Sequence, residues 1–428
     1  MAEDPDGANV TVDGIVKRPE YQYSPPQAFF DAPDGDTNLT GPDIYQVENF
    51  GAVADPSVDN RIAIQNAINA ANRNGGGVVV LKSGTYGVGI RPANATTSEG
   101  GILLKNNVFL KGQGMDKSVL RVFDGWESSR KLTGIVRTPW GEATKNVGVS
   151  DLTLDGNREN TNGVVDGYFS GGIPGTDISD QDAWVFRVEI RNCEGYGFDP
   201  HERTVRLSIT DCIAHHNGKD GFVADFCIDG EFKNNVSYEN DRHGFNIVTS
   251  TNDFLLSDNI ARDNGGGGFV VQRGSYDIPL PNNVLIEGGE SFGNEKEGVL
   301  IKMSYNVEIR EVYIHDNGTY GVRLYGASNV SVLNNRIIDN SRAKDGSYPA
   351  IQIKDYEGDE ASGRTYYAES NLISDNDIDW SDGLSGKGEV QVDAENEDWA
   401  PSAAREKTFC VAVVGICLDL VTVLLSFF

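Results

Sequence analysis

One glycine recurs along the middle of the chain at a nearly constant interval. Six segments align on it, at intervals of 24, 23, 24, 30 and 23 residues: Gly197, Gly221, Gly244, Gly268, Gly298 and Gly321. After each glycine, the first and third residues are apolar or proline and the fourth is mostly polar, as in Phe222-Val223-Ala224-Asp225. Alternation with a period of two places neighbouring residues on opposite faces of a strand. Its repetition at a fixed interval predicts a parallel β-helix, with the first set stacked inward as a core.

An antiparallel β-sandwich would also give many short strands, but it would not hold one glycine in register over six repeats. Before the repeats, residues 59–68 carry apolar side chains at helical spacing, Gly75-Gly76-Gly77 ends that helix, and residues 78–81 are typical of a strand. The open end of a solenoid must be covered. We therefore expect an all-β solenoid with an N-terminal capping helix.

Composition divides the rest of the chain. Residues 1–44 are polar and acidic without periodicity, which predicts a loosely ordered extension. We expect the solenoid over 45–390, a polar linker over 391–408 and a hydrophobic tail over 409–428. The tail is long enough to cross a bilayer, although Asp419 near its centre would cost about 2.5–3.5 kcal/mol there. The alternatives are a segment that packs on the solenoid end and a sequence unrelated to the rest.

The charge of the chain limits its partners. Acidic residues outnumber basic ones 64 to 36, for a net charge of −28, which argues against nucleic acid. The five cysteines are odd in number and not in CxxC spacing, so neither a zinc site nor a disulfide framework is indicated. The N-terminus shows no recognisable secretory signal. A site for a polyanion would have to concentrate Lys and Arg locally.

Titratable residues cluster on the outward face of the first aligned coils. Tyr196, Asp199 and His201 lie on one coil and Asp225 on the next, and the third carries Arg242 and His243. Adjacent coils are ~4.8 Å apart and alternate residues along a strand ~6.6 Å apart. His201 and Asp225 occupy the same column on neighbouring coils, so we expect them to be in lateral contact.

Further polar residues follow along the solenoid axis. Lys302 lies in the column of His201 four coils on, ~19 Å away, and Gln272 lies between them. Arg323 is on the sixth coil. These residues are too far away to join one chemical step. A row of such groups fits an extended polymer better than a small molecule.

Tyr, His and carboxylates in one cluster suit proton transfer at a carbon next to a carboxylate, which must first be neutralised. Arg242 or a protonated Asp199 or Asp225 would supply this, since two close carboxylates raise one pKa. His201 and Tyr196 would accept and donate the proton. Reprotonation on the opposite face gives an epimer, whereas expulsion of the 4-linked sugar makes the enzyme a lyase.

Two other functions use the same scaffold. Asp199 and Asp225 could be the paired carboxylates of a glycoside hydrolase. The Tyr–His pair beside them makes a hydrolase the weaker alternative. A non-catalytic carbohydrate-binding solenoid or tail-spike adhesin is the other alternative. It would not need His and Tyr aligned with two acids.

Several segments carry a resemblance to a known family: GYGFDPHE at 195–202, DGFVAD at 220–225 and DRHGFN at 241–246, with further matches at 151–158, 271–274 and 300–303. Over residues 45 to 325 the chain closely resembles the catalytic A-module of secreted bacterial mannuronan C5-epimerases. The resemblance implies a right-handed, pectate-lyase-like parallel β-helix. It also implies conversion of β-D-mannuronate to α-L-guluronate within alginate, usually with calcium.

The resemblance also implies residue roles. By motif match, four residues correspond to the family's active site: Tyr196, Asp199, His201 and Asp225. Seven more match its substrate groove: Arg242, His243, Lys302, Gln272, Arg323, Asp166 and Asn246. Where relatives carry a lysine two residues before Asp166, this chain has Val164, so one contact to the substrate carboxylate is missing.

The resemblance leaves the calcium ligands unassigned; Asp151 and Asp155 are candidates among many acids. The chain lacks the Gly-Gly-x-Gly-x-Asp repeats that many relatives append, and the end of its solenoid looks shorter. We expect a monomer that acts on polymannuronate outside the cell or at its surface, with membrane contact through 409–428 as one alternative.

Overall fold

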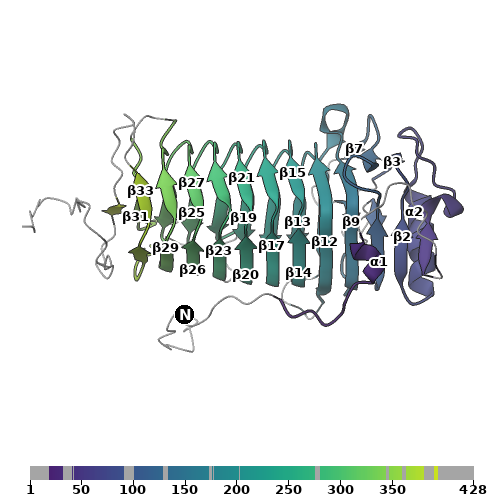
Figure 1. The fold of residues 1–428 in the computed structure, drawn as a ribbon, viewed down its shortest axis with the longest axis horizontal. Coiled ribbons are helices and arrows are strands. Elements are labelled where there is room, and N and C mark those ends of the chain that lie inside the picture. The colour runs from purple at the N-terminus through teal and green to yellow at the C-terminus, as the bar shows by residue number, and fades with distance from the viewer. Residues whose placement is uncertain are drawn as a thin grey trace, which may run out of the picture.

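The coils stack into one long solenoid (Figure 1). The computed structural model describes residues 19–31, 41, 43–90, 101–128, 134–172, 176, 178–201, 203–274, 280–343, 347–358, 363–379 and 390–393. From residue 198 onward, each complete coil contributes one strand to a first sheet and two to a second. All pairings between the described strands of these sheets are parallel, as predicted.

Within the described residues, the first sheet has 11 strands. They are β4 (Ile102–Leu103), β8 (Gly134–Arg137), β11 (Asp166–Gly171), β13 (Phe198–His201), β16 (Phe222–Asp225), β19 (Phe245–Val248), β22 (Phe269–Gln272), β25 (Val299–Lys302), β28 (Val322–Tyr325), β31 (Ile351–Lys354) and β34 (Val390–Asp393). We call it the groove sheet, because the predicted site residues lie on it or on the turns before it. β34 adds three residues of the predicted linker, whose period-two alternation continues the pattern of the coils.

The second sheet has 21 strands in the described part of the chain. They are β1 (Ile44–Gln46), β2 (Gly77–Val80), β3 (Gly84–Val88), β5 (Val108–Lys111), β6 (Ser118–Val122), β9 (Lys145–Asp155), β12 (Asp180–Arg191), β14 (Thr204–Thr210), β15 (Ile213–His215), β17 (Ile228–Lys233), β18 (Val236–Tyr238), β20 (Asn252–Ser257), β21 (Ile260–Arg262), β23 (Asn282–Glu287), β24 (Glu290–Phe292), β26 (Tyr305–Arg310), β27 (Tyr313–His315), β29 (Ser328–Leu333), β30 (Arg336–Ile338), β32 (Leu372–Ser374) and β33 (Asp377–Asp379). We call it the back sheet. A small pair joins β7 (Glu127–Ser128) and β10 (Asn162–Gly163).

The residue after each repeated glycine faces inward. Phe198, Phe222 and Phe245 are fully buried, and their rings stack at centroid distances of 4.5 and 4.7 Å. The glycines themselves are required by space, since a Cβ at Gly221 would overlap the Ser237 hydroxyl of the next coil. The period-two pattern therefore predicts the core correctly.

An asparagine ladder fixes the spacing of the coils at one corner. Each side-chain amide donates to the side-chain oxygen of the next asparagine at 2.9–3.0 Å, through Asn217, Asn240, Asn264, Asn294, Asn317 and Asn340. Corner residues often adopt a left-handed conformation. Among the described residues, 31 non-glycine residues have a positive φ, and 11 of them are Asp and 9 Asn, whose side chains tolerate that conformation.

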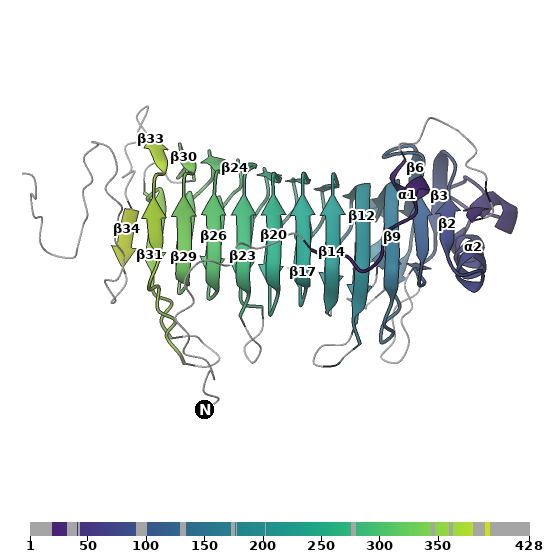
Figure 2. The same cartoon turned by 60° about the horizontal axis from the view of Figure 1, so that its bottom comes forward.

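The capping helix is α2 (Arg61–Arg73), which lies at the end of the solenoid beyond β2 (Figure 2). Ile64, Ala67, Ile68 and Ala71 of this helix are buried against the first coils. The short 3₁₀ helix η1 (Val47–Phe50) packs beside it. A second 3₁₀ helix, η2 (Arg158–Asn160), follows β9.

Part of the N-terminal extension, expected to be loosely ordered, packs on the back sheet. Phe29 in α1 (Gln27–Phe30) is fully buried in a cluster with Phe109 and Trp184, and the Tyr21 ring packs against Trp184 in a tilted arrangement with 5.1 Å between ring centroids. Lys111 donates to the carbonyl oxygens of Phe29 and Asp31 at 3.0 and 2.8 Å. Isolated aromatic anchors, rather than a periodic pattern, hold residues 19–31.

The predicted tail at 409–428 lies outside the described residues, as do residues 394–408. No helix in the described part of the chain is long and apolar enough to cross a membrane.

Candidate active site

The centre of the site is a buried carboxylate. Asp199 on β13 is fully buried, and neither of its oxygens has a hydrogen-bond partner among the residues that the structure describes. Burial raises the pKa of Asp199 well above its usual range, and the nearby charges of Asp166 and Asp225 raise it further, while His201 opposes them. A carboxyl group in this setting favours its protonated form, which can donate a hydrogen bond to a ligand.

His201 and Asp225 make the lateral contact expected from the coil spacing. His201 Nε2 lies 3.1 Å from Asp225 Oδ2, and both side chains are less than one-fifth exposed. The imidazole stacks on Phe169 of β11 at 5.7 Å between ring centroids. The carboxylate orients the imidazole and stabilises the charged form that arises when His201 takes up a proton.

Tyr196 lies on the turn before β13, with cations on two sides of its phenol ring. Arg242 Nη1 donates to the Tyr196 hydroxyl at 3.5 Å, and Lys219 Nζ lies 4.2 Å from the ring centroid. Burial raises the pKa of Tyr196, and the charges of Asp199 and Asp220 raise it further, while Arg242 opposes them. The phenol is therefore neutral and carries a proton that it can donate.

Asp220 organises the next coil. This fully buried carboxylate accepts hydrogen bonds from the His243 backbone N–H at 2.9 Å and from the Asn246 side chain at 2.8 Å, and it lies 3.4 Å from Arg242 Nε. His243 Nδ1 accepts the Gly267 N–H at 2.9 Å, and burial lowers the His243 pKa. His243 is thus a neutral imidazole whose Nε2–H can donate.

Two buried charges lie beneath this surface. Asp166, predicted to line the groove, is fully buried, and its Oδ1 accepts the Tyr196 backbone N–H at 2.7 Å. It positions Tyr196 instead, and burial raises its pKa to about 6. Arg137 on β8 is buried over the Phe169 ring at 4.5 Å, and desolvation lowers its pKa to about 10.

The remaining predicted groove residues lie on β22, β25 and β28. Gln272 donates to the Asn246 side chain at 3.1 Å and lies in register with Lys302 on the next strand. Lys302 Nζ lies 5.1 Å from the Tyr356 ring centroid. Arg323 donates to Gln352 at 2.9 Å and lies 3.4 Å from Glu297. These residues lie along the groove sheet on the coils beyond the cluster, as the sequence predicted.

Sequence reasoning missed Arg137, Lys219 and Asp220. Arg137 is in register with Phe169, which is in register with Asp199. Extending the column upstream of the glycine repeats would therefore have identified Arg137. Lys219 and Asp220 lie in the turn before Gly221, outside the period-two alternation of the strand.

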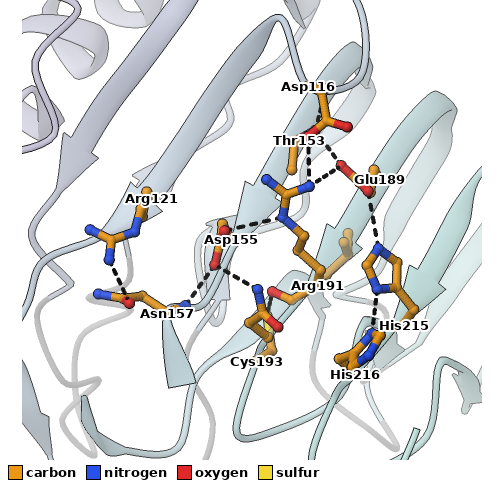
Figure 3. A network of polar contacts seen from close by, with 12 residues as sticks. Asp116, Arg121, Thr153, Asp155, Asn157, Glu189, Arg191, Cys193, His215 and His216 are labelled. Atoms are coloured by element: carbon orange, nitrogen blue, oxygen red, sulfur yellow. Dashed lines mark hydrogen bonds and ion pairs between the residues drawn. The ribbon is translucent and has the colours of Figure 1, made fainter. Parts of the chain in front are cut away.

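The two calcium candidates do not offer free oxygens. Asp151 is buried between Lys111 and Arg187. Asp155 pairs with Arg191 at 3.1 Å and accepts the Asn157 N–H, within a network that runs on to Glu189 and His215 (Figure 3). No group of three or more His, Cys, Asp or Glu in the described part of the chain could hold a metal ion. These residues do not fit a calcium site.

Comparison with known proteins identifies the family of this chain. The family model described as a right handed beta helix region matches residues 142–287 and 280–388, which agrees with the predicted hand of the coils. The A-module of mannuronan C-5 epimerase AlgE6 from Azotobacter vinelandii is 43% identical, with a TM-score of 0.77 over 85% of this chain and 100% of that one. The chain belongs to the mannuronan C5-epimerase A-module family.

Other members of the mannuronan C5-epimerase family are longer. AlgE5 from A. vinelandii is 52% identical over 335 residues, 78% of this chain and 33% of that protein. Alginate lyase 7 from the same organism is 47% identical over 328 residues, 77% of this chain and 38% of that protein. The chain therefore spans about a third of the length of these relatives. An exopolygalacturonase from Thermotoga maritima, 15% identical with a TM-score of 0.56 over 82% of this chain and 89% of that one, shares the fold alone.

Proposed function

We propose that this protein epimerises β-D-mannuronate residues to α-L-guluronate within alginate. The observation that carries the proposal is the buried, partnerless Asp199 between the His201–Asp225 pair and the Tyr196–Arg242 contact. A hydrogen-bond donor, a base and a proton donor thus surround one point on the groove sheet. The family membership supports the same substrate class.

The first requirement is to neutralise the substrate carboxylate. Removing the C5 proton places the electron pair of the C–H bond in that carboxylate, which becomes a doubly negative enolate. A protonated Asp199 donates a hydrogen bond to it, and the Arg242 guanidinium compensates the charge. Both groups act more strongly as the negative charge develops, which lowers the barrier.

The proton then moves across the sugar ring. His201 accepts it from C5, and Asp225 stabilises the imidazolium that forms. Tyr196 donates its hydroxyl proton to the opposite face of C5, and Arg242 stabilises the phenolate. Solvent returns the proton from His201 to Tyr196, so the residues end as they began. Expulsion of the 4-linked sugar from the same enolate would give a lyase product.

The test is turnover of polymannuronate in deuterated water, followed by proton NMR and by absorbance of the unsaturated uronate. We expect guluronate signals with deuterium at C5 and no rise in absorbance. A rise in absorbance would make the protein a lyase, and neither signal would favour a binding solenoid.

A matched pair of variants locates the chemistry. His201→Ala should abolish turnover. His315→Ala removes a similar His–acid pair on the back sheet, with Nε2 2.8 Å from Glu290, and should retain it. Equal loss in both variants would mean that the effect is on folding rather than on the site.

The proposal has further parts that rest on the resemblance. We propose that the protein acts as a monomer outside the cell or at its surface, with calcium; membrane contact through residues 409–428 is an alternative that rests on the length of that segment. When bound, calcium would supply positive charge near a polyanionic substrate. Chelation should lower turnover if calcium is required, and light scattering with and without lipid vesicles tests the monomer and the membrane contact.

A further inference from the structure

One half-buried cation at the site has no anionic partner. In the part of the chain that the structure describes, the Lys219 ammonium makes no ion pair and no side-chain hydrogen bond; its contact is with the Tyr196 ring, 4.2 Å away. Most basic groups nearby are engaged: Arg242 with Asp220, and Arg158 with Glu194 and Asp241. The Lys219 ammonium is thus open to an anionic ligand at the site.

Backbone hydrogen bonds between coils show where Lys219 lies. The Gly195 N–H donates to Val165, Lys219 to Gly195 at 3.1 Å, and Arg242 to Lys219 at 3.4 Å. The same ladder continues through Gly266 to Lys296. Lys219, Arg242 and Lys296 thus form a basic rim along the edge of the groove sheet, with Lys219 at the end nearest Asp166 and Tyr196.

The charge of Lys219 reaches the buried acids of the site. It lowers the pKa of both Asp166 and Asp199, against the larger effect of burial. Gly195 separates Lys219 from Val165 in the backbone ladder and contributes no side chain, so Tyr196 is the neighbour of the ammonium on that coil. An anion bound above Asp199 would therefore meet the ammonium as well.

We propose that Lys219 binds the carboxylate of the uronate residue at the catalytic position. It thereby supplies the positive charge that is missing at Val164, where relatives carry a lysine. Val164 lies two coils from Lys219 in the same backbone ladder, next to Val165. The inference rests on the proposed function and deepens it by naming the group that holds the reacting sugar.

A purely structural role makes a different prediction. If Lys219 only covers the Tyr196 ring, methionine should replace it, because Met is unbranched and adapts to aromatic surfaces. If the charge binds the uronate, Lys219→Met should lower kcat/KM by about 10- to 100-fold, the size expected for a charge-assisted hydrogen bond. The loss should fall mainly on kcat, since the carboxylate gains charge in the transition state.

Two further variants complete the experiment. Lys233→Met removes a half-buried lysine at the end of β17 on the back sheet and should leave kcat/KM unchanged. Val164→Lys in the Lys219→Met background should restore at least part of the lost rate, because it returns a cation to the same carboxylate. Thermal unfolding of each variant shows whether the fold is kept.

The outcomes are distinct. Wild-type turnover with a kcat loss in Lys219→Met and recovery in the double variant supports the inference. Unchanged kinetics in Lys219→Met, or a loss that Val164→Lys does not relieve, overturns it. If the wild type produces neither guluronate nor unsaturated ends, the proposed function fails. In that case the role of Lys219 is tested separately, by calorimetric measurement of polymannuronate binding. Equal Kd values for wild type and Lys219→Met overturn the inference.

Discussion

Two buried aspartates on strands of this solenoid have opposite surroundings. Asp151 on β9 of the back sheet is 1% exposed, and its carboxylate is shared by Lys111 and by Arg187, which donates at 2.5 and 2.9 Å. Asp199 on the groove sheet is 0% exposed and has no partner on either oxygen. The burial is the same, but the compensation of charge is not.

This difference distinguishes the structural role of Asp151 from the functional role of Asp199. Lys111 also holds the carbonyl oxygens of Phe29 and Asp31, so the Asp151 cluster fastens the N-terminal segment to the solenoid. Buried polar groups are almost always satisfied in native proteins. A buried carboxylate without a partner therefore marks a position reserved for a ligand.

The largest expected effect is on catalysis. Asp199→Ala should lower turnover about 10²- to 10³-fold, since it removes the hydrogen-bond donor to the developing enolate, which asparagine would partly retain. Asp151→Asn should remain within about threefold of wild type well below its melting temperature, because its cluster lies on the back sheet. Initial rates by NMR measure the activity of both variants. Comparable losses would show that Asp199 is no more important for catalysis than Asp151.

Stability should respond in the opposite way. Asp151→Asn leaves the buried Lys111 and the half-buried Arg187 without their counter-charge, and breaking a buried pair costs about 3–5 kcal/mol. Urea unfolding of the variant gives this value directly. A cost below about 1 kcal/mol would show that the cluster does not fasten the N-terminal segment.

Asp199→Asn should make the protein more stable near neutral pH, because asparagine has no charged form whose burial would destabilise the folded state. The pKa of Asp199 is raised in the folded state, so the folded protein binds this proton more tightly than the unfolded chain does. Wild-type stability is therefore lost as the pH rises above the unfolded pKa, about 4. The gain in the variant should be largest at pH 7 and shrink toward pH 4, and a gain independent of pH would contradict this account.

The smallest effect is expected from salt. The basic rim is partly exposed, so raising the salt concentration from about 0.05 M to about 0.5 M should increase KM for polymannuronate a few-fold by screening. The buried Asp151 cluster is screened far less, and the melting temperature should change little. A KM that does not depend on salt would argue against an electrostatic groove.

The sequence allowed the coils and much of the cluster to be predicted, because one glycine register aligns residues on neighbouring strands. That register places His201 against Asp225 and puts Lys302 and Arg323 further along. It could not predict that Asp166 lies beneath Tyr196, since burial depends on how the turn closes over it. Nor could it predict the docking of Phe29, which packs as a single aromatic residue without a period.

The residues with left-handed backbone conformation offer one explanation for the high content of acidic residues in this protein. Eleven aspartates in the described residues occupy a backbone conformation that most side chains avoid. Asparagine is used at nine others, so the two residues are exchangeable for shape but not for charge. A share of the net charge of −28 is thus a by-product of coil geometry rather than of partner selection. Solenoids built from the same corners can differ widely in isoelectric point and still present the same groove.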